Sequence, residues 1–300
     1  MTDLHSTPRP PRVLREQVRV MGYGLRRPAA LAALLLVAAG AAGVTVAAVY
    51  TGEKVSFHPE QLMLPGVAGL LLPIGVWRGE ERFGAGFLWT LPVDRRWHAL
   101  ARVGAGWVWL MAAVALFVLW ILGLALATGG NVLGGETLRL FHPADIYAAQ
   151  GTLQPGAWRT IRHAPQPLLW LVPFTSATAC YLLASAVALG ARHPARWVVG
   201  AVLGFMLVRT AGEALGAEWL HGGLGGFLNG LLAGPYGFDT MLTARTEILK
   251  VGTTLSTGEP AELWRALPDP GQWAAATLLW TAAGLLALWA AASRHREDRP

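Results

Sequence analysis

Arg209 and Glu213 form the charged pair best placed to act inside an apolar segment. They are four residues apart in an otherwise apolar run, so on a helix they lie one turn apart on the same face. A charged side chain at the centre of a membrane helix costs about 2.5–3.5 kcal/mol, and it usually faces a partner or a water-filled cavity. Two interpretations follow. The pair forms a gate or part of a substrate path, or it is a structural ion pair at a helix end that water reaches.

Familiar catalytic motifs do not account for the remaining polar residues. A Walker A loop ends in Gly-Lys-Ser/Thr, and neither of the two lysines, Lys54 and Lys250, follows a glycine. The chain has no Gly-x-Ser-x-Gly elbow and no His-Glu-x-x-His zinc pair. His221 lies near Glu213 and Glu218, but this spacing fits no standard ligand pattern. We therefore predict that the chain is not itself an enzyme, has no catalytic or metal-binding residues, and binds no cofactor of its own.

The composition indicates a membrane protein. Of 300 residues, 54% are hydrophobic and only 14% are charged, against roughly 25% charged residues in soluble domains. The apolar residues gather in runs, which favours a single polytopic membrane domain over residues 1–300. The single cysteine, Cys180, excludes a disulfide framework within the chain, and its place inside an apolar run predicts a packing role.

Six apolar runs predict an all-α fold with six transmembrane helices. The runs cover residues 28–50, 61–77, 103–128, 167–190, 197–216 and 273–293. The second run is short and contains Pro65 and Pro73, which spans tolerate where neighbouring helices bind the freed carbonyl groups. In the fourth run Ser176, Cys180 and Ala184 recur every fourth residue, and such a stripe of small residues allows helices to approach closely.

The segments outside the spans also carry signals. The arm 1–27 holds six arginines, and Leu14, Val18, Met21 and Leu25 recur with the spacing of one helix face. We predict an interfacial amphipathic helix; the alternative is a solvated basic tail that only fixes topology. Two long outer loops, 129–166 and 217–271, lie within the six-span region 28–293. The glycine-rich apolar part of the second loop, residues 220–232, is too short to span and is predicted to be re-entrant or interfacial.

The basic residues predict the orientation. If both termini are cytoplasmic, the arm, the inner loops and the tail 294–300 hold 16 of the 24 Lys and Arg residues, whereas the much longer outer loops hold 7. Cytoplasmic segments of membrane proteins carry this excess of Lys and Arg. The positive balance is therefore explained by topology and by contact with membrane lipid, and it does not indicate nucleic-acid binding.

The stretch Arg78–Arg102, between the second and third runs, is rich in both charge and aromatic residues. Phe83, Phe87 and Leu91 recur every fourth residue, which is the spacing of one helix face. Pro92 ends this helix, because proline lacks an N–H and clashes with the preceding turn. The sequence then predicts a second helix, capped by Asp94 and continuous with the third span.

This stretch resembles the signature of permease subunits of type 2 (exporter-type) ABC transporters. That signature is an acidic pair, a nearby glycine, and Leu-Pro-Val-x-Arg before a long apolar helix. The matching positions are Glu80, Glu81, Gly84, Leu91, Pro92, Val93 and Arg95. The family usually has a small polar residue before the arginine, where this chain has Asp94. The six-span layout with an arm before the first span is also similar to that family.

The resemblance implies a coupling helix near Glu80–Leu91 on the cytoplasmic face of the bacterial inner membrane. Phe83 and Phe87 would fill a cleft in a separate ABC-type ATPase subunit, and the acidic pair would contact its basic residues. ATP and Mg²⁺ would be bound by that ATPase. A second permease, either an identical or a related chain, would complete the translocation path.

Two other interpretations remain for this stretch and for the chain. The helix could instead contact lipid through its aromatic side chains, with its two acids stabilising a helix N-terminus. The whole chain could be a non-transporting scaffold or sensor subunit that needs no ATPase. An ion-coupled secondary transporter would show repeated halves and more ionisable residues at the membrane midplane, and the sequence shows neither.

Overall fold

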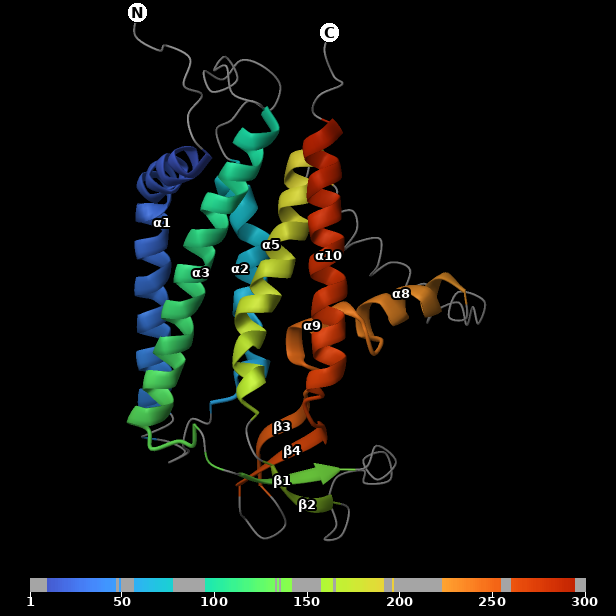
Figure 1. Ribbon diagram of the computed structural model, residues 1–300. Coiled ribbons are helices and arrows are strands. Elements are labelled where there is room, and N and C mark those ends of the chain that lie inside the picture. Colours follow the sequence, from blue (N-terminus) through green and yellow to red (C-terminus); the bar gives the residue numbers. More distant parts are fainter. Residues whose placement is uncertain are drawn as a thin grey trace, which may run out of the picture.

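The computed structural model describes residues 10–46, 49, 57–77, 95–132, 134, 136–141, 158–163, 166–191, 196, 223–254 and 260–294. Most of these residues are helical. The longest helices are α1 (Pro10–Val46), α2 (Leu64–Val76), α3 (Arg95–Ala127), α5 (Val172–Gly190) and α10 (Pro270–Arg294). They stand side by side as a bundle, and a small β-sheet lies beyond one end of it (Figure 1). We call this end the sheet end, and the opposite end, where α1 begins, the N-terminal end.

Shorter elements lie toward the sheet end and the side of the bundle (Figure 1). The strands are β1 (Glu136–Phe141), β2 (Trp158–His163), β3 (Glu247–Thr254) and β4 (Pro260–Ala266), and the short helices are η2 (Pro59–Gln61), η4 (Pro167–Leu171), α8 (Leu224–Ala233) and α9 (Phe238–Thr243). Helix α8 overlaps the segment 220–232, which was predicted to be too short to span, and it projects sideways from the bundle (Figure 1).

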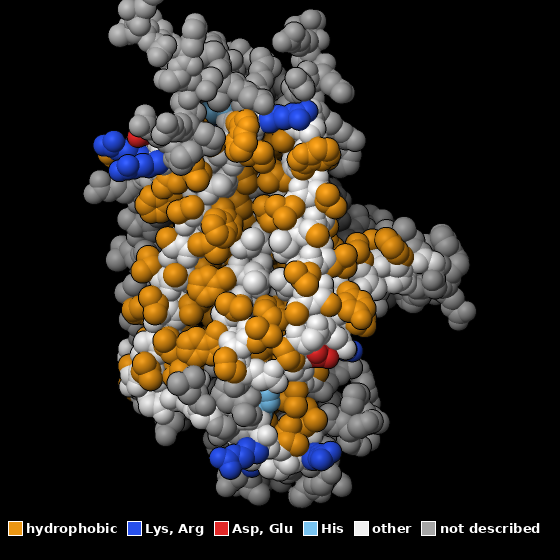
Figure 2. Space-filling model, viewed as in Figure 1, with side chains coloured by type: hydrophobic (Ala, Val, Ile, Leu, Met, Phe, Trp, Pro, Cys, Tyr) orange, Lys and Arg blue, Asp and Glu red, His pale blue; other side chains and the backbone are white. Residues whose placement is uncertain are grey.

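Within the described residues, three helices are long and apolar enough to cross a membrane. They cover Arg96–Ala127, Pro167–Gly190 and Pro270–Ser293, and α2 is a shorter apolar helix. Hydrophobic side chains cover the visible face of the bundle between its ends, while Lys and Arg side chains lie toward the two ends (Figure 2). This distribution is the one that a bundle within a bilayer requires, because charged side chains are costly at membrane depth.

Helix α2 turns its small residues inward and its large apolar residues outward. Its buried residues are Pro65, Gly66, Gly69, Pro73 and Val76, whereas Leu71 and Ile74 are 59% and 60% exposed. A soluble protein buries its large apolar side chains first. Membrane helices instead pack through small residues, because lipid is as apolar as leucine. The arrangement of α2 is therefore that of a membrane helix.

The bundle helices alternate in direction in a way that constrains the topology. Helices α1 and α3 run from the N-terminal end toward the sheet end, and α2, α5 and α10 run the opposite way (Figure 1). Since α5 ends at the N-terminal end and α10 begins at the sheet end, the chain between them must return across the length of the bundle. The predicted fifth span, residues 197–216, falls in this interval, although it lies outside the described residues.

The apolar face predicted for the N-terminal arm is present at the start of α1, and much of it packs against the other helices of the bundle. Met21 is buried in the core, and Val18 and Leu25 pack against it. The indole nitrogen of Trp109 on α3 donates a hydrogen bond of 2.9 Å to the carbonyl oxygen of Val18. A side chain at Gly22 would meet the same indole ring at 2.7 Å. The start of α1 is therefore attached to α3.

The small-residue stripe of the fourth run packs closely against α2. Ser176 and Cys180 are buried on α5, which confirms their predicted packing role, and Ala184 is half-buried. A Cβ atom at Gly69 of α2 would lie 2.5 Å from the carbonyl oxygen of Ala177 and 3.2 Å from the Cβ of Cys180. Only glycine permits this approach, so α2 and α5 touch almost backbone to backbone.

The all-α prediction is wrong in the two long loops that the sequence places on the outer side. Residues 136–141 and 158–163 of the first loop and residues 247–254 and 260–266 of the second pair into one four-stranded sheet of order β2-β1-β4-β3. Strands β1 and β2 are antiparallel, and β1 pairs in parallel with β4, so the sheet joins the two loops. Strands of six to eight residues are too short to stand out as apolar runs. The pairing of β1 with β4, which joins the two halves of the sheet, links residues more than a hundred positions apart.

The sheet has one face toward the bundle. Leu138 of β1 is buried and Trp264 of β4 is fully buried, and both belong to the face formed by the β1–β4 register Leu140↔Trp264. On the other face, Thr137 and its antiparallel partner Arg162 are exposed. The alternation of buried and exposed side chains along a strand thus attaches the sheet to the bundle through aromatic and aliphatic groups.

We expect Gly69→Ala to destabilise the bundle, because the added methyl group must push α5 away from α2. Overpacking of this kind typically costs about 1–3 kcal/mol, seen as a lower midpoint of thermal unfolding in detergent. The matched control is Gly123→Ala on α3, where an added Cβ meets nothing within 4 Å. That variant should keep or raise the midpoint, since alanine favours helix. Equal midpoints for the two variants would contradict the close α2–α5 contact.

Candidate functional site

Most residues of the predicted coupling helix lie outside the described residues. This holds for Glu80, Glu81, Phe83, Gly84, Phe87, Leu91 and Pro92, and also for the predicted intramembrane pair Arg209 and Glu213. Arg95 begins α3. What the structure describes is the pair of helix ends that flank the predicted coupling stretch in the sequence, namely Trp77 after α2 and Arg95 at the start of α3. Both lie at the N-terminal end.

A cluster that we call the Arg102 junction holds these two helix ends together. It consists of Val76 and Trp77 at the end of α2, Arg102 and Val103 on α3, and Tyr181 on α5. The guanidinium group of Arg102 donates two hydrogen bonds to the carbonyl oxygen of Val76, at 2.9 Å from Nε and 2.6 Å from Nη2. The carbonyl groups in the last turn of a helix have no partner within the helix, so Arg102 satisfies one of them from a neighbouring helix.

The electrostatics of the Arg102 junction favour the positive charge. The C-terminus of a helix carries a partial negative charge, which attracts cations, and Val76 lies in the last turn of α2. The guanidinium carbon of Arg102 also lies 5.4 Å from the ring centroid of Trp77, within the range of a cation–π interaction. Val76 and Trp77 are both buried. Hydrogen bonds from a charged donor are worth about 1.5–3 kcal/mol, and burial leaves water little chance to replace them.

Tyr181 extends the junction to a third helix. This fully buried side chain donates a hydrogen bond of 2.8 Å to the carbonyl oxygen of Val103, the residue after Arg102. Gly106 lies directly beneath the Tyr181 hydroxyl group, and an added Cβ there would also lie 2.9 Å from a methyl group of Val76. Residues 102–106 of α3 are therefore in contact with both α2 and α5.

Sequence reasoning assigned Arg102 only a topological charge. The available signal was its position two turns inside α3, at the point where the apolar part of this helix begins. His98, four residues earlier and so on the same face of α3, is also buried. Arg102 and His98, two polar residues on one face of a membrane helix, were the sequence feature that could have indicated contacts with a neighbouring helix.

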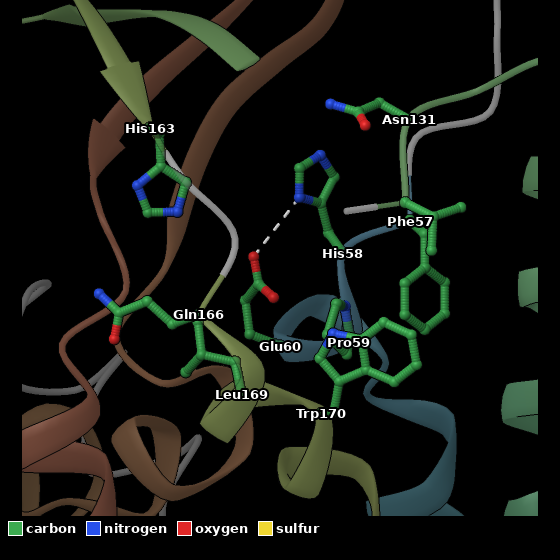
Figure 3. Close-up of a pocket in the computed structure, with 10 residues that line it drawn as sticks. Phe57, His58, Pro59, Glu60, Asn131, His163, Gln166, Leu169 and Trp170 are labelled. Carbon is green, nitrogen blue, oxygen red and sulfur yellow. Dashed lines mark ion pairs between the residues drawn. The ribbon is translucent and has the colours of Figure 1, made fainter. Parts of the chain in front are cut away.

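A second group of polar residues lies at the sheet end. A small pocket there is lined by Phe57, His58, Pro59, Glu60, Asn131, Val132, His163, Gln166, Leu169 and Trp170. Glu60 is only 3% exposed, and its carboxylate lies 3.5 Å from Nδ1 of His58. Figure 3 shows these two side chains turned toward each other, with His163 on the other side of Glu60.

The pocket joins the bundle to the sheet. His58 and Glu60 come from the η2 segment that precedes α2, and His163 ends β2. The His58 ring packs edge-on against Trp264 of β4, with 5.3 Å between the ring centroids. Among the described residues, no group of three or more His, Cys, Asp and Glu side chains is arranged to hold a metal ion. The geometry fits a polar joint between the segment before α2 and the sheet.

The chain matches no protein-family model, no curated protein and no solved structure. The interpretation of the two described sites therefore rests on their geometry in this structure. The Arg102 junction brackets the predicted coupling stretch, and the sheet-end pocket lies at the opposite end of the same helix, α2.

We expect Trp264→Ala to loosen the sheet from the bundle while the helices stay associated. Truncating a fully buried tryptophan costs about 3–5 kcal/mol, and here it also removes the ring that His58 contacts. Limited proteolysis in mild detergent, with cleavage sites identified by mass spectrometry, should show faster cutting within residues 129–166 and 247–266. Trp289→Ala on α10, where the side chain is 65% exposed, is the control. Unchanged cutting in Trp264→Ala would contradict the attachment.

Proposed function

We propose that this chain is the membrane-spanning permease subunit of an ATP-driven transporter of the type 2, exporter-type ABC class. The observation that carries the proposal is the acidic pair and the Leu-Pro-Val-x-Arg pattern between the second and third apolar runs. Glu80, Glu81, Gly84, Leu91, Pro92 and Arg95 supply this pattern. A separate ATPase subunit supplies the energy, because this chain has no Walker A loop.

The helix ends on either side of the predicted coupling stretch support the proposal. Helix α2 ends at Val76 and α3 begins at Arg95, and both of these helix ends lie where α1 begins (Figure 1). Helix α1, which carries arginines of the arm, begins at this end, and α10 ends there at Arg294 (Figure 1). The positive-inside rule therefore assigns this end to the cytoplasm. A cytoplasmic ATPase would meet the coupling stretch there. The sheet then lies on the outer side of the bacterial inner membrane.

The alternation of helix directions supports six spans with both termini inside. The first, third and fifth spans would cross outward, and the second, fourth and sixth would cross back. A second permease, identical or related, would complete the translocation path, as it does in the family that the chain resembles. The alternative function, a scaffold or sensor subunit, shares the six spans and differs in needing no ATPase.

The orientation is tested by cysteine labelling in a Cys180→Ala background. Thr160→Cys introduces a thiol at an exposed position of β2, and Arg19→Cys introduces one at an exposed position of α1. A membrane-impermeant maleimide should label Thr160→Cys in intact spheroplasts, and Arg19→Cys only after permeabilisation. Both should react in detergent, which controls for reactivity. The reverse pattern would overturn the orientation. Labelling of both in intact spheroplasts would overturn the cytoplasmic placement of the N-terminal end, and labelling of neither would overturn the outer placement of the sheet.

The ATPase partnership is tested by purifying the tagged chain in mild detergent from its native cells. We expect an ATPase subunit in stoichiometric amount, with ATP hydrolysis in the purified sample. Phe87→Asp and Glu81→Arg should each lose the ATPase, because they put a charge into the proposed cleft contact or reverse the charge of the acidic pair.

The matched controls for this experiment are Tyr23→Asp and Glu16→Arg, at exposed positions of α1 at the same end of the bundle. Both should retain the ATPase. Recovery of the wild-type chain without any ATPase, in several detergents and at native expression, would reject the transporter function and favour the scaffold.

A further inference from the structure

We infer that Arg102 is the positioning residue that holds the end of α2 against α3, so that a force applied beyond Trp77 by the proposed ATPase is passed on to the bundle. This inference rests on the proposed function and names the group that links ATPase movement to the helices. Its basis is the geometry of the Arg102 junction, in which one side chain of α3 holds the end of α2.

The last turn of α2 is weak by its sequence. Pro73 lacks an N–H, so the helical hydrogen bond to the carbonyl group of Gly69 is missing. Gly75 adds backbone freedom in the same turn. Left alone, this turn would act as a hinge between the coupling stretch and the rest of α2, because prolines and glycines are the usual sites of helix bending.

Arg102 removes that freedom from outside the helix. Its two hydrogen bonds of 2.9 and 2.6 Å converge on the Val76 carbonyl oxygen, and its guanidinium lies over the Trp77 ring. A planar guanidinium with several fixed donors holds an oxygen in one orientation, which the single ammonium group of lysine does not do. The end of α2 and the first turns of α3 consequently move together.

The contacts that continue from this junction lead into the bundle. Tyr181 of α5 binds the carbonyl group of Val103, and Gly69 of α2 contacts Ala177 of α5. Gly284 of α10 would place a Cβ 2.9 Å from Leu182 of α5. A displacement of the coupling stretch therefore reaches α5 and α10 through close contacts, provided that the end of α2 does not bend.

The experiment compares Arg102→Gln and Arg102→Lys with the wild-type chain in nanodiscs, in complex with its co-purified ATPase. The control is Arg19→Gln, which removes the same charge from an exposed position at the same end. Backbone hydrogen exchange is followed in two regions: the amides of residues 74–77, and those of α5 and α10 with and without ATP and Mg²⁺.

We expect exchange at residues 74–77 to be at least about tenfold faster in Arg102→Gln, a loss corresponding to about 1.4 kcal/mol of local stability. Arg102→Lys should lie between this variant and the wild type. The ATPase should still co-purify, since the cleft contact is intact. The ATP-dependent change in α5 and α10 should fall by at least half in Arg102→Gln and remain in Arg19→Gln.

Each of the other possible results contradicts a specific part of the proposal. Unchanged exchange at residues 74–77 would show that Arg102 does not hold the end of α2. Faster exchange there, with the ATP-dependent change intact, would reduce Arg102 to a structural residue. If Arg102→Gln does not fold, the proposal is tested with Arg102→Lys by the same two measurements: exchange at residues 74–77, and the ATP-dependent change in α5 and α10. If the wild-type chain recovers no ATPase, the proposed function fails and the coupling role of Arg102 fails with it.

Discussion

The contact between Gly69 of α2 and the backbone of α5 at Ala177 is the constraint on which the arrangement of the bundle depends. In a bilayer, helices gain little by burying leucine against leucine, because lipid offers the same environment. Association has to come from close packing of backbones, and glycine on one helix against small residues on the other achieves it. Helix α5 meets α10 in the same manner at Gly284 and Leu182. The large apolar side chains are consequently left to face outward.

Close packing of this kind does not provide hydrogen-bond partners for the backbone polar groups at the helix ends. Every backbone carbonyl group near the membrane interior needs a partner, because water is scarce there. The end of α2 meets this requirement through Arg102, and the hydroxyl group of Tyr181 binds a carbonyl group of α3. These hydrogen bonds join different helices, so the groups that satisfy the backbone also fix the helices relative to one another.

Sequence patterns predicted the features that depend on local spacing. Apolar runs located α3, α5 and α10, the period of four located the buried Ser176 and Cys180, and the spacing of Leu14, Val18, Met21 and Leu25 located the packed face of α1. Each of these signals lies within a single helix. The sheet was missed because strand β1 pairs with β4, more than a hundred residues away, and no local pattern encodes that partner. The role of Arg102 was missed for the same reason, since its partner is a backbone oxygen on another helix.

The length of α2 connects the two sites. Its 13 residues extend about 20 Å at 1.5 Å per residue, which is less than the roughly 30 Å hydrocarbon core of a bilayer. Polar groups at its two ends therefore lie closer to the apolar interior than those of a full-length span, and both find partners within the protein. At the N-terminal end the partner is Arg102. At the sheet end, Glu60 of the preceding η2 turn lies beside His58, which in turn contacts Trp264 of the sheet. A short helix held at both ends by protein groups thus joins the Arg102 junction to the sheet-end pocket through one continuous element.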